Sequence, residues 1–331
     1  MKIFPLLLQG FNEAIIGHVD VFICSASFEK RCLAIPRVVA GRSPSRVLIS
    51  ENQNHIELHG QNPGILRNLF AGRGAMVFGD TGNPLRTADA LLAALRDCAG
   101  PTVRTVVVDV TAFTHEGLLI LLRLLPMSFP TATFYLGYTR AAEYSVGEPL
   151  ETKWLSRGVS DVRPILGYSG EFIPWRPLHL ILLGGFESDR ALELIRTLEP
   201  THISLGIARA GESNSEFDVL AMQNIAQIKA IYGGADEFTF HPYSPASAHH
   251  AIAERTQAIP AFNVAVAPMS TKLSTIGAAL AAIEHEEIQL CYPQAVLYNY
   301  LRYSRSADSA FLVQVEAAEL LAGVDADRID V

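Results

Sequence analysis

The chain has 331 residues, enough for two ordinary domains, and 49% of them are hydrophobic while 18% are charged. This composition favours large buried cores and excludes a disordered chain. The formal net charge of −8 excludes a protein that coats DNA or RNA non-specifically, since neutralising phosphates requires a surplus of surface lysine and arginine.

The first 20 residues predict no secretory signal peptide, because they contain one lysine and a short apolar run without a small-residue cleavage site after it. The most hydrophobic stretch, Gly117 to Leu125, is about half as long as the ~20 residues of a membrane span and contains Arg123. The four cysteines form no CxxC pair and no metal-ligand spacing. We therefore expect a cytoplasmic protein with reduced core thiols and no membrane partner.

The two halves of the chain repeat each other. Near the start of each half, an apolar strand leads through a turn of small residues into Phe-Glu, then an arginine and a helix. The first copy is Phe28-Glu29 with Arg31, and the second is Phe186-Glu187 with Arg190, at an offset of about 158 residues.

The repeat continues in the same order along both halves. The matched elements are strands 46–50 and 201–206, strands 75–79 and 237–241, helices 87–98 and 247–259, strands 105–109 and 262–267, helices 116–125 and 274–283, and strands 133–138 and 288–292. Short apolar strands that alternate with amphipathic helices are typical of a parallel sheet covered on both faces.

The sequence therefore predicts an α/β protein of two tandem Rossmann-like halves with parallel sheets, related by internal duplication about a pseudo-twofold axis. We assign residues 1–150 to the first half, 151–177 to a crossover and 178–331 to the second half. The tail 306–331 is predicted to form a short amphipathic helix with an acidic end.

Ligands of open parallel sheets bind at the carboxyl ends of the strands, which selects the loops 24–31, 109–116, 184–190 and 267–274. In the last loop, Ser270, Thr271 and Lys272 stand directly before an Ala/Leu-rich helix. The free N–H groups and the dipole of a helix start favour an anion there. The alternative is that Ser270 or Thr271 only caps the helix and Lys272 is solvated.

The matching loop of the first half has no lysine. Asp109 would accept a hydrogen bond from a ribose hydroxyl, bind a metal or cap the next helix. His115 and Glu116 form a candidate acid/base pair, although adjacent residues at a helix start point in different directions. An ordinary helix N-terminus also explains Glu116.

The arginines of the repeated motif have two interpretations. In the first, Arg31 and Arg190 pair locally with their glutamates, and Phe28 and Phe186 pack each helix on its sheet. In the second, the two arginines clamp phosphates in a shared cleft.

Tyr138 and Tyr292 end matched strands, where they either stack on a base or belong to the core.

Several common functions lack their motifs. His241, His249 and His250 are not spaced for chelation, so neither a metal nor a cofactor is expected. The chain has no GxGxxG turn after the first strand, no Walker A sequence and no GxSxG elbow, which disfavours classical dinucleotide binding, P-loop NTP binding and α/β-hydrolase chemistry.

Asn263 followed by Pro268-Met269-Ser270-Thr271-Lys272 at a helix start resembles the late-strand motif of CARF domains, the Rossmann-like sensors of CRISPR-associated and related antiphage systems. The turn Ser25-Ala26-Ser27 is similar to the other CARF ligand loop. The duplication resembles SAVED domains, in which two CARF-like units are fused. The resemblance implies a cyclic oligonucleotide held by both halves, with Thr271 and Lys272 on its phosphates.

Three functions follow as hypotheses. The first is a sensor of a phosphate-bearing nucleotide, bound in the cleft between the halves, that signals through a separate protein effector and pairs as a homodimer. The second is an enzyme on a nucleotide-like substrate, a phosphodiesterase or ring nuclease or hydrolase that uses Asp109, His115 or Glu29. The third is a scaffold without a ligand. The residues expected to contact a ligand are Ser25, Ser27, Phe28, Glu29, Arg31, Asp109, Thr111, Tyr138, Gly184, Gly185, Phe186, Glu187, Arg190, Pro268, Met269, Ser270, Thr271, Lys272 and Tyr292.

Overall fold

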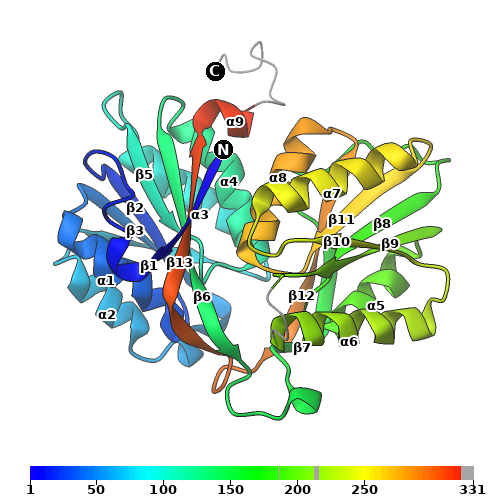
Figure 1. Cartoon of the computed structure of the whole chain (residues 1–331). Helices are drawn as coiled ribbons and strands as arrows, with labels where there is room; N and C mark the ends of the chain where they lie inside the picture. Colours follow the sequence, from blue (N-terminus) through cyan, green and yellow to red (C-terminus); the bar gives the residue numbers. More distant parts are fainter. Residues whose placement is uncertain (186, 212–215, 322–331) are drawn as a thin grey trace. The chain divides into compact units, whose positions relative to one another are not determined.

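The computed structural model describes residues 1–185, 187–211 and 216–321, which form two compact units. Unit 1 contains Met1–Gly147 and Tyr300–Leu321, and unit 2 contains Glu148–Asn299. Each unit is an α/β fold with one sheet of mostly parallel strands (Figure 1). The prediction of two Rossmann-like halves is therefore confirmed.

Unit 1 has a seven-stranded sheet in the order β1-β13-β6-β5-β2-β3-β4. Its strands are β1 (Lys2–Leu7), β2 (Val21–Ala26), β3 (Arg46–Asn52), β4 (Gly74–Gly79), β5 (Thr105–Asp109), β6 (Thr133–Tyr144) and β13 (Ser304–Glu316). Its α-helices are α1 (Ala34–Val39), α2 (Asn62–Leu69), α3 (Pro84–Cys98), α4 (His115–Ser128) and α9 (Ala317–Leu321).

Unit 2 has a six-stranded sheet in the order β10-β9-β8-β11-β12-β7. Its strands are β7 (Ser156–Pro164), β8 (Leu178–Leu183), β9 (His202–Ala208), β10 (Asp236–Phe240), β11 (Asn263–Pro268) and β12 (Ile288–Tyr298). Its α-helices are α5 (Ser188–Leu198), α6 (Glu216–Ile231), α7 (Pro245–Ala258) and α8 (Lys272–Glu284). In Figure 1, α5 and α6 cover one face of this sheet and α7 and α8 cover the other.

The two sheets share one topology. The parallel strands run β4-β3-β2-β5-β6 in unit 1 and β10-β9-β8-β11-β12 in unit 2, so the first parallel strand of each unit is central and the chain order reverses beside it. The central strands are apolar at nearly every position because helices cover both faces. All residues of β2, β5 and β11 are buried.

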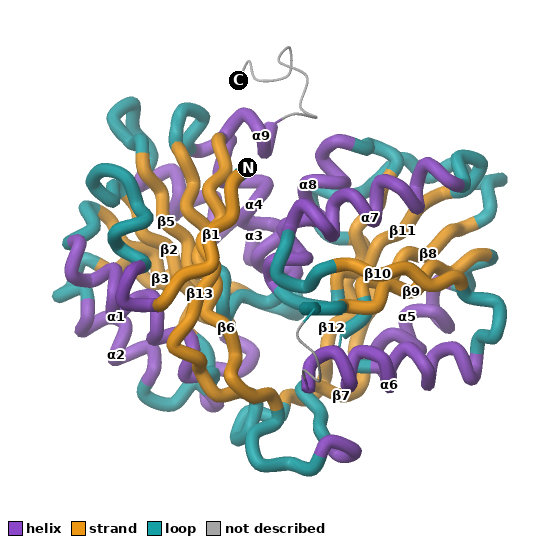
Figure 2. Tube along the Cα trace, viewed as in Figure 1, coloured by secondary structure: helices purple, strands orange, loops and turns teal. Residues whose placement is uncertain are grey.

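Each sheet also contains an antiparallel strand that follows the other unit's last parallel strand in the chain. β7 follows β6 in sequence but pairs with β12, and β13 follows β12 but pairs with β6. We call β7 and β13 the exchanged strands. Both are labelled in Figure 2, where strands are drawn in orange.

The exchanged strands correct two predictions. The segment 151–177 is more than a crossover, because it contributes β7 to the sheet of unit 2. Of the tail 306–331, the residues up to Glu316 belong to β13, and among the described residues only Ala317–Leu321 (α9) are helical; residues 322–331 lie outside the described part. The second half of β13 enters the core, where Ala310, Leu312, Val313 and Val315 are buried.

Among the described residues, every cysteine is free, with Cys24, Cys32 and Cys291 buried. Within the same ranges, no helix combines the length and the apolar character that a membrane crossing requires.

Candidate ligand-binding site

The point where strand order reverses is the usual ligand site of a Rossmann-like sheet, because the chain after the two flanking strands leads there to opposite faces of the sheet. In unit 1 this point lies between β2 and β5, and in unit 2 it lies between β8 and β11. Both points fall on loops that the sequence selected. The two units differ in the residues at this point: backbone contacts of glycines join the loops of unit 2, whereas a buried aspartic acid ends β5 in unit 1.

In unit 2, the loops after β8 and β11 touch through their backbones. A Cβ atom on Gly185 would lie 2.0 Å from the carbonyl oxygen of Met269, and one on Gly184 would lie 2.7 Å from that of Gly206. The N–H of Met269 donates to Leu183 O at 3.1 Å, which ties the end of β11 to the end of β8. The pair of glycines is therefore required for the close approach of these loops.

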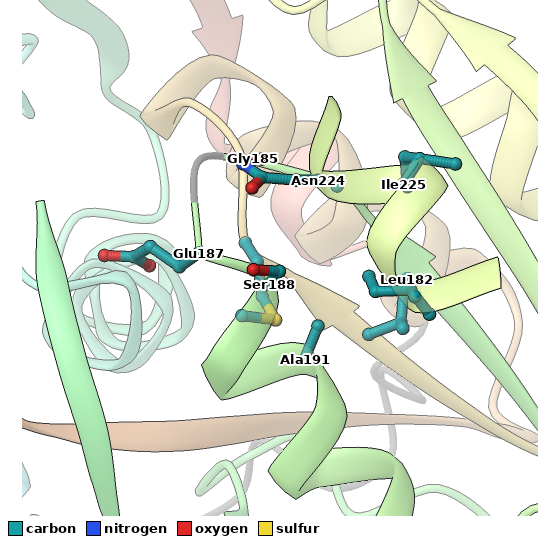
Figure 3. A pocket seen from close by; sticks show the side chains of 10 residues that line it. Leu182, Gly185, Glu187, Ser188, Ala191, Asn224 and Ile225 are labelled. Atoms are coloured by element: carbon teal, nitrogen blue, oxygen red, sulfur yellow. Dashed lines mark hydrogen bonds between the residues drawn. The ribbon is translucent and has the colours of Figure 1, made fainter. Parts of the chain in front are cut away.

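A shallow pocket lies at this junction and contains about 270 Å³ of empty space, including the part open to solvent. Apolar side chains form most of its wall, while the polar groups at its rim come from the β8 loop, α5 and α6. The lining residues are Leu182, Gly184, Gly185, Glu187, Ser188, Ala191, Asn224, Ile225, Ile228 and Met269. Figure 3 shows the carboxylate of Glu187 pointing away from the apolar side chains of Leu182, Ala191 and Ile225.

Helix α6 fixes the rim of this pocket. Asn224 Nδ2 donates to the carbonyl oxygen of Gly185 at 2.9 Å, and Ser188 Oγ donates to Gln227 Oε1 at 2.7 Å. These bonds hold the loop after β8 and the first residue of α5 against one neighbouring helix. Asn224 lies outside the loops that the sequence selected, and Ser188 lies within the loop 184–190 but was not among the residues expected to contact a ligand.

The start of α8 contains a threonine that caps the helix and a serine whose hydroxyl has no hydrogen-bond partner among the described residues. Thr271 Oγ1 accepts from Ser274 N at 3.2 Å and donates to the carbonyl oxygen of Pro242, so the capping interpretation holds for Thr271. Ser270 Oγ is buried and has no hydrogen-bond partner within the described ranges. Lys272 is the first helical residue and is half-buried. Pro268 ends β11 directly before this loop.

The guanidinium group of Arg190 is buried in a cluster of hydrogen bonds and is not open to solvent. Its guanidinium donates to Glu187 Oε2 at 2.5 Å, to Ser156 Oγ at 3.1 Å and, through Nε, to Pro293 O at 3.1 Å. It also lies over the ring of Tyr292, 5.6 Å from the centroid. We call Glu187, Arg190 and Ser156 the unit 2 clasp.

Unit 1 repeats this cluster. Arg31 pairs with Glu29 and donates to Ser304 Oγ at 3.0 Å and to the carbonyl oxygen of Thr139 at 2.9 Å. Ser304 Oγ donates in turn to Glu29, and the guanidinium lies 5.7 Å from the centroid of the Tyr138 ring. We call Glu29, Arg31 and Ser304 the unit 1 clasp.

The clasps support the structural interpretation of the repeated motif. Arg31 and Arg190 are 3% and 5% exposed, and their donors are engaged by partners of their own unit. Tyr138 and Tyr292 are buried beneath these guanidinium groups. The interpretations as phosphate clamps and base-stacking platforms are therefore corrected, since a ligand would have to displace bonds that are already made.

The carboxyl end of β5 in unit 1 is closed by Asp109. Its Oδ1 accepts from the backbone N–H and the hydroxyl of Thr111, at 3.0 and 2.5 Å, and Thr111 Oγ1 accepts from Thr139 N at 2.9 Å. Burial raises the pKa of Asp109 to about 7, and the bonds from Thr111 only partly oppose this. Asp109 and Thr111 thus form a buried network.

Of the other residues selected in unit 1, two are buried and Ser27, Phe28 and His115 are half-buried. Ser25 is buried in β2, and Ser27 accepts from Glu29 N at 3.3 Å. Phe28 meets the ring of Tyr303 edge-on at 5.4 Å. His115 opens α4 after the Thr114 cap, and Glu116 is buried. Phe186 lies outside the described residues.

The sequence did not identify the two serines of the clasps. Ser156 and Ser304 stand on the exchanged strands, 12 residues after Tyr144 and 6 residues after Tyr298 respectively. These unequal spacings hide the repeat. Their equivalence becomes visible in the sheet register, where Ser304 pairs with Tyr144 and Ser156 with Tyr298.

No cluster of three or more histidine, cysteine or carboxylate side chains suited to a metal occurs in the part of the chain that the structure describes. His249 lies against Glu284 at 2.6 Å, and His241 Nδ1 accepts from Tyr243 N at 3.2 Å.

No family model and no curated protein sequence matches this chain. Among solved structures, the pyocyanin biosynthetic protein PhzM is similar over 44% of this chain, which spans only 38% of PhzM, with 12% identity and a TM-score of 0.24. A protein of unknown function from Pseudomonas aeruginosa PAO1 is similar over 86% of this chain and 92% of its own, with 9% identity and a TM-score of 0.24. A protein described as a universal stress protein of Pseudomonas aeruginosa UCBPP-PA14 covers 86% and 93%, with 10% identity and a TM-score of 0.24. These similarities assign the chain to no family.

Proposed function

We propose that unit 2 binds a phosphate-bearing nucleotide, such as a cyclic oligonucleotide, where the loops after β8 and β11 meet. The observation that carries this proposal is the glycine-dependent contact of Gly185 with Met269, which brings the loops that precede α5 and α8 together at the reversal of strand order. Rossmann-like sheets use this position for nucleotide phosphates because helix starts offer N–H donors.

The start of α8 supplies the groups that a phosphate requires. The cap by Thr271 uses the N–H of Ser274, and the first turn of a helix has further N–H groups without intrahelical acceptors. Ser270 Oγ is a buried hydroxyl without a partner among the described residues, and a ligand oxygen would satisfy it. Lys272 adds a positive charge at the positive end of the helix dipole.

The comparison between the units supports an anion in unit 2 rather than in unit 1. The last residue of β5 is Asp109, whereas the last residue of β11 is Pro268, and the residue that opens the following helix is His115 in unit 1 and Lys272 in unit 2. Of these two helix starts, that of α8 in unit 2 carries the lysine. The proposed ligand therefore depends mainly on one unit.

In this proposal the protein binds the nucleotide as a sensor and signals to a separate effector protein, as the resemblance to CARF and SAVED domains implies. Glu29, one of the residues considered for an enzymatic role, is committed to Arg31 and Ser304. A sensor returns its ligand unchanged, and an enzyme does not. Mass spectrometry of a labelled cyclic oligonucleotide after overnight incubation distinguishes the two.

The test is a calorimetric titration with cyclic di- and tri-adenylate and with inorganic pyrophosphate, comparing Lys272→Ala with Lys229→Ala. Lys229 belongs to the same unit but forms a surface ion pair with Glu237, so its loss is a charge-matched control. We expect at least a roughly tenfold loss of affinity for Lys272→Ala alone, the usual scale of one charge-assisted contact. The proposal is rejected if none of these ligands binds the wild-type protein.

A further inference from the structure

Ser156 joins the proposed ligand loop to β7, the strand at the edge of the sheet. It stands at the first position of β7, is 4% exposed, and its hydroxyl donates to Glu187 Oε1 while accepting from Arg190 Nη1 at 3.1 Å. Glu187 directly precedes α5 and lines the pocket. One hydroxyl therefore contacts both charged groups at the start of α5.

The unit 2 clasp connects three elements. Arg190, in the first turn of α5, also binds the carbonyl oxygen of Pro293 in β12 through Nε and Nη2. The start of α5 is thus fixed to β12 and to β7 on one side, and Asn224 fixes Gly185 on the other. Bonds between charged groups at a buried site impose strict geometry.

We propose that Ser156 is a positioning residue for the ligand site of unit 2. Its hydroxyl orients Glu187 and Arg190, and these set the backbone of Gly184, Gly185 and Ser188 that faces the ligand. The inference rests on the proposed function and adds a residue that neither the loop motif nor the sequence repeat indicated.

The chain contains a matched control. Ser304 likewise donates to Glu29 and accepts from Arg31, through Nε, in unit 1, where no phosphate is proposed to bind. Ser156→Ala and Ser304→Ala therefore remove the same hydroxyl from the same kind of cluster. Both variants are expected to lose stability, but only the first is expected to lose affinity.

The experiment titrates inorganic pyrophosphate by calorimetry into wild type, Ser156→Ala, Ser156→Thr and Ser304→Ala, and measures amide hydrogen exchange of the unliganded proteins. We expect Ser156→Ala to bind about tenfold more weakly or worse, as for a lost bond to a charged group, and to exchange faster at Gly185 and Ser188. Ser156→Thr retains the hydroxyl and is expected to restore both properties. Ser304→Ala is expected to bind as the wild type does.

Two results overturn the inference, and they are distinguishable from each other. If the wild type binds pyrophosphate and Ser156→Ala binds equally well, or Ser304→Ala loses as much affinity, the site stands but Ser156 does not position it. If the wild type binds neither pyrophosphate nor the cyclic adenylates of the preceding titration, the phosphate site fails and the positioning role fails with it. The exchange rates then report only whether the clasp orders the loop.

Discussion

At the scale of single residues, the two units place different side chains at equivalent positions. The last residue of β5 is a buried aspartic acid whose pKa is raised to about 7 by burial, and the last residue of β11 is a proline. At this buried site the charged carboxylate would lose its hydration, so Asp109 is compatible with the folded state when neutral and destabilises it when ionised. Asp109 is therefore a pH-dependent element of unit 1.

The first prediction concerns Asp109→Asn. In the unfolded chain the carboxyl titrates near 3.8, so between pH 4 and 7 the unfolded state loses a proton that the folded state keeps, and rising pH destabilises the wild type. The amide keeps the acceptor for Thr111 and does not titrate. We expect the free energy of unfolding of the variant, relative to wild type, to rise by on the order of 3 kcal/mol across this range and to level off above it.

Urea unfolding at pH 4, 5.5, 7 and 8 measures this difference. Asp89→Asn, at an exposed position of α3 in the same unit, is the control and should show no such trend. A constant difference between Asp109→Asn and wild type at all four pH values would show that Asp109 is charged in the folded protein.

The second prediction concerns Gly185→Ala. A Cβ atom 2.0 Å from the Met269 carbonyl oxygen forces the loops after β8 and β11 apart, because neither backbone can yield without breaking the bond of Met269 N to Leu183. We expect a loss of stability on the order of 3 kcal/mol, together with loss of pyrophosphate binding. Gly233→Ala is the control, since a Cβ atom there meets nothing within 4 Å. Equal urea midpoints for the two variants would contradict the contact.

At the scale of elements, the repeated Phe-Glu and arginine motif is a device that attaches an exchanged strand. In both units the arginine at the first helix after the central strand binds a serine on the antiparallel strand and a carbonyl oxygen on the last parallel strand. The motif therefore fixes the outer strands of the sheet to its centre. Its conservation between the halves reflects this structural role.

Since period and apolar runs depend on near neighbours, pattern alone predicted the parallel strands and most of the helices that follow them, but not α2 or α6. It did not predict β7 or β13. The alternation along Ser304–Glu316 is interrupted by a register shift between Ser306 and Ala310, and β7 contains a shift opposite Gln294. Bulges of this kind change which residues face the core, so a regular pattern is lost.

At the scale of the whole molecule, the chain is two copies of one fold that have exchanged their antiparallel strands. Exchange of equivalent elements between copies is the pattern of domain swapping, here completed within one polypeptide. Each unit consequently depends on a segment that follows the other unit's last parallel strand. A division of the chain near residue 150 leaves unit 1 without β13.

The last prediction tests this dependence. Met1–Gly147 joined directly to Tyr300–Leu321 is expected to fold cooperatively, because Ser145 and Val146 already donate to the carbonyl oxygens of Tyr303 and Arg302, at 3.0 and 2.7 Å, so the joint closes a hairpin. A fragment of residues 1–150 lacks the buried side chains of β13 and Ser304, and is expected to remain unfolded. Circular dichroism and urea unfolding compare the two, and equal stability of both fragments would contradict the exchange.

The sequence by itself determined the fold class, the duplication and the position of the loops at the carboxyl ends of the strands, because these follow from local periodicity and from the repetition of short motifs. Only the tertiary structure decided which selected residues are available to a ligand. Arg31, Arg190, Tyr138 and Tyr292 are engaged with partners far away in sequence, whereas Ser270 Oγ is left without one among the described residues. Whether a polar group is free depends on every neighbour in space, and the exchanged strands supply the neighbours that no local pattern indicates.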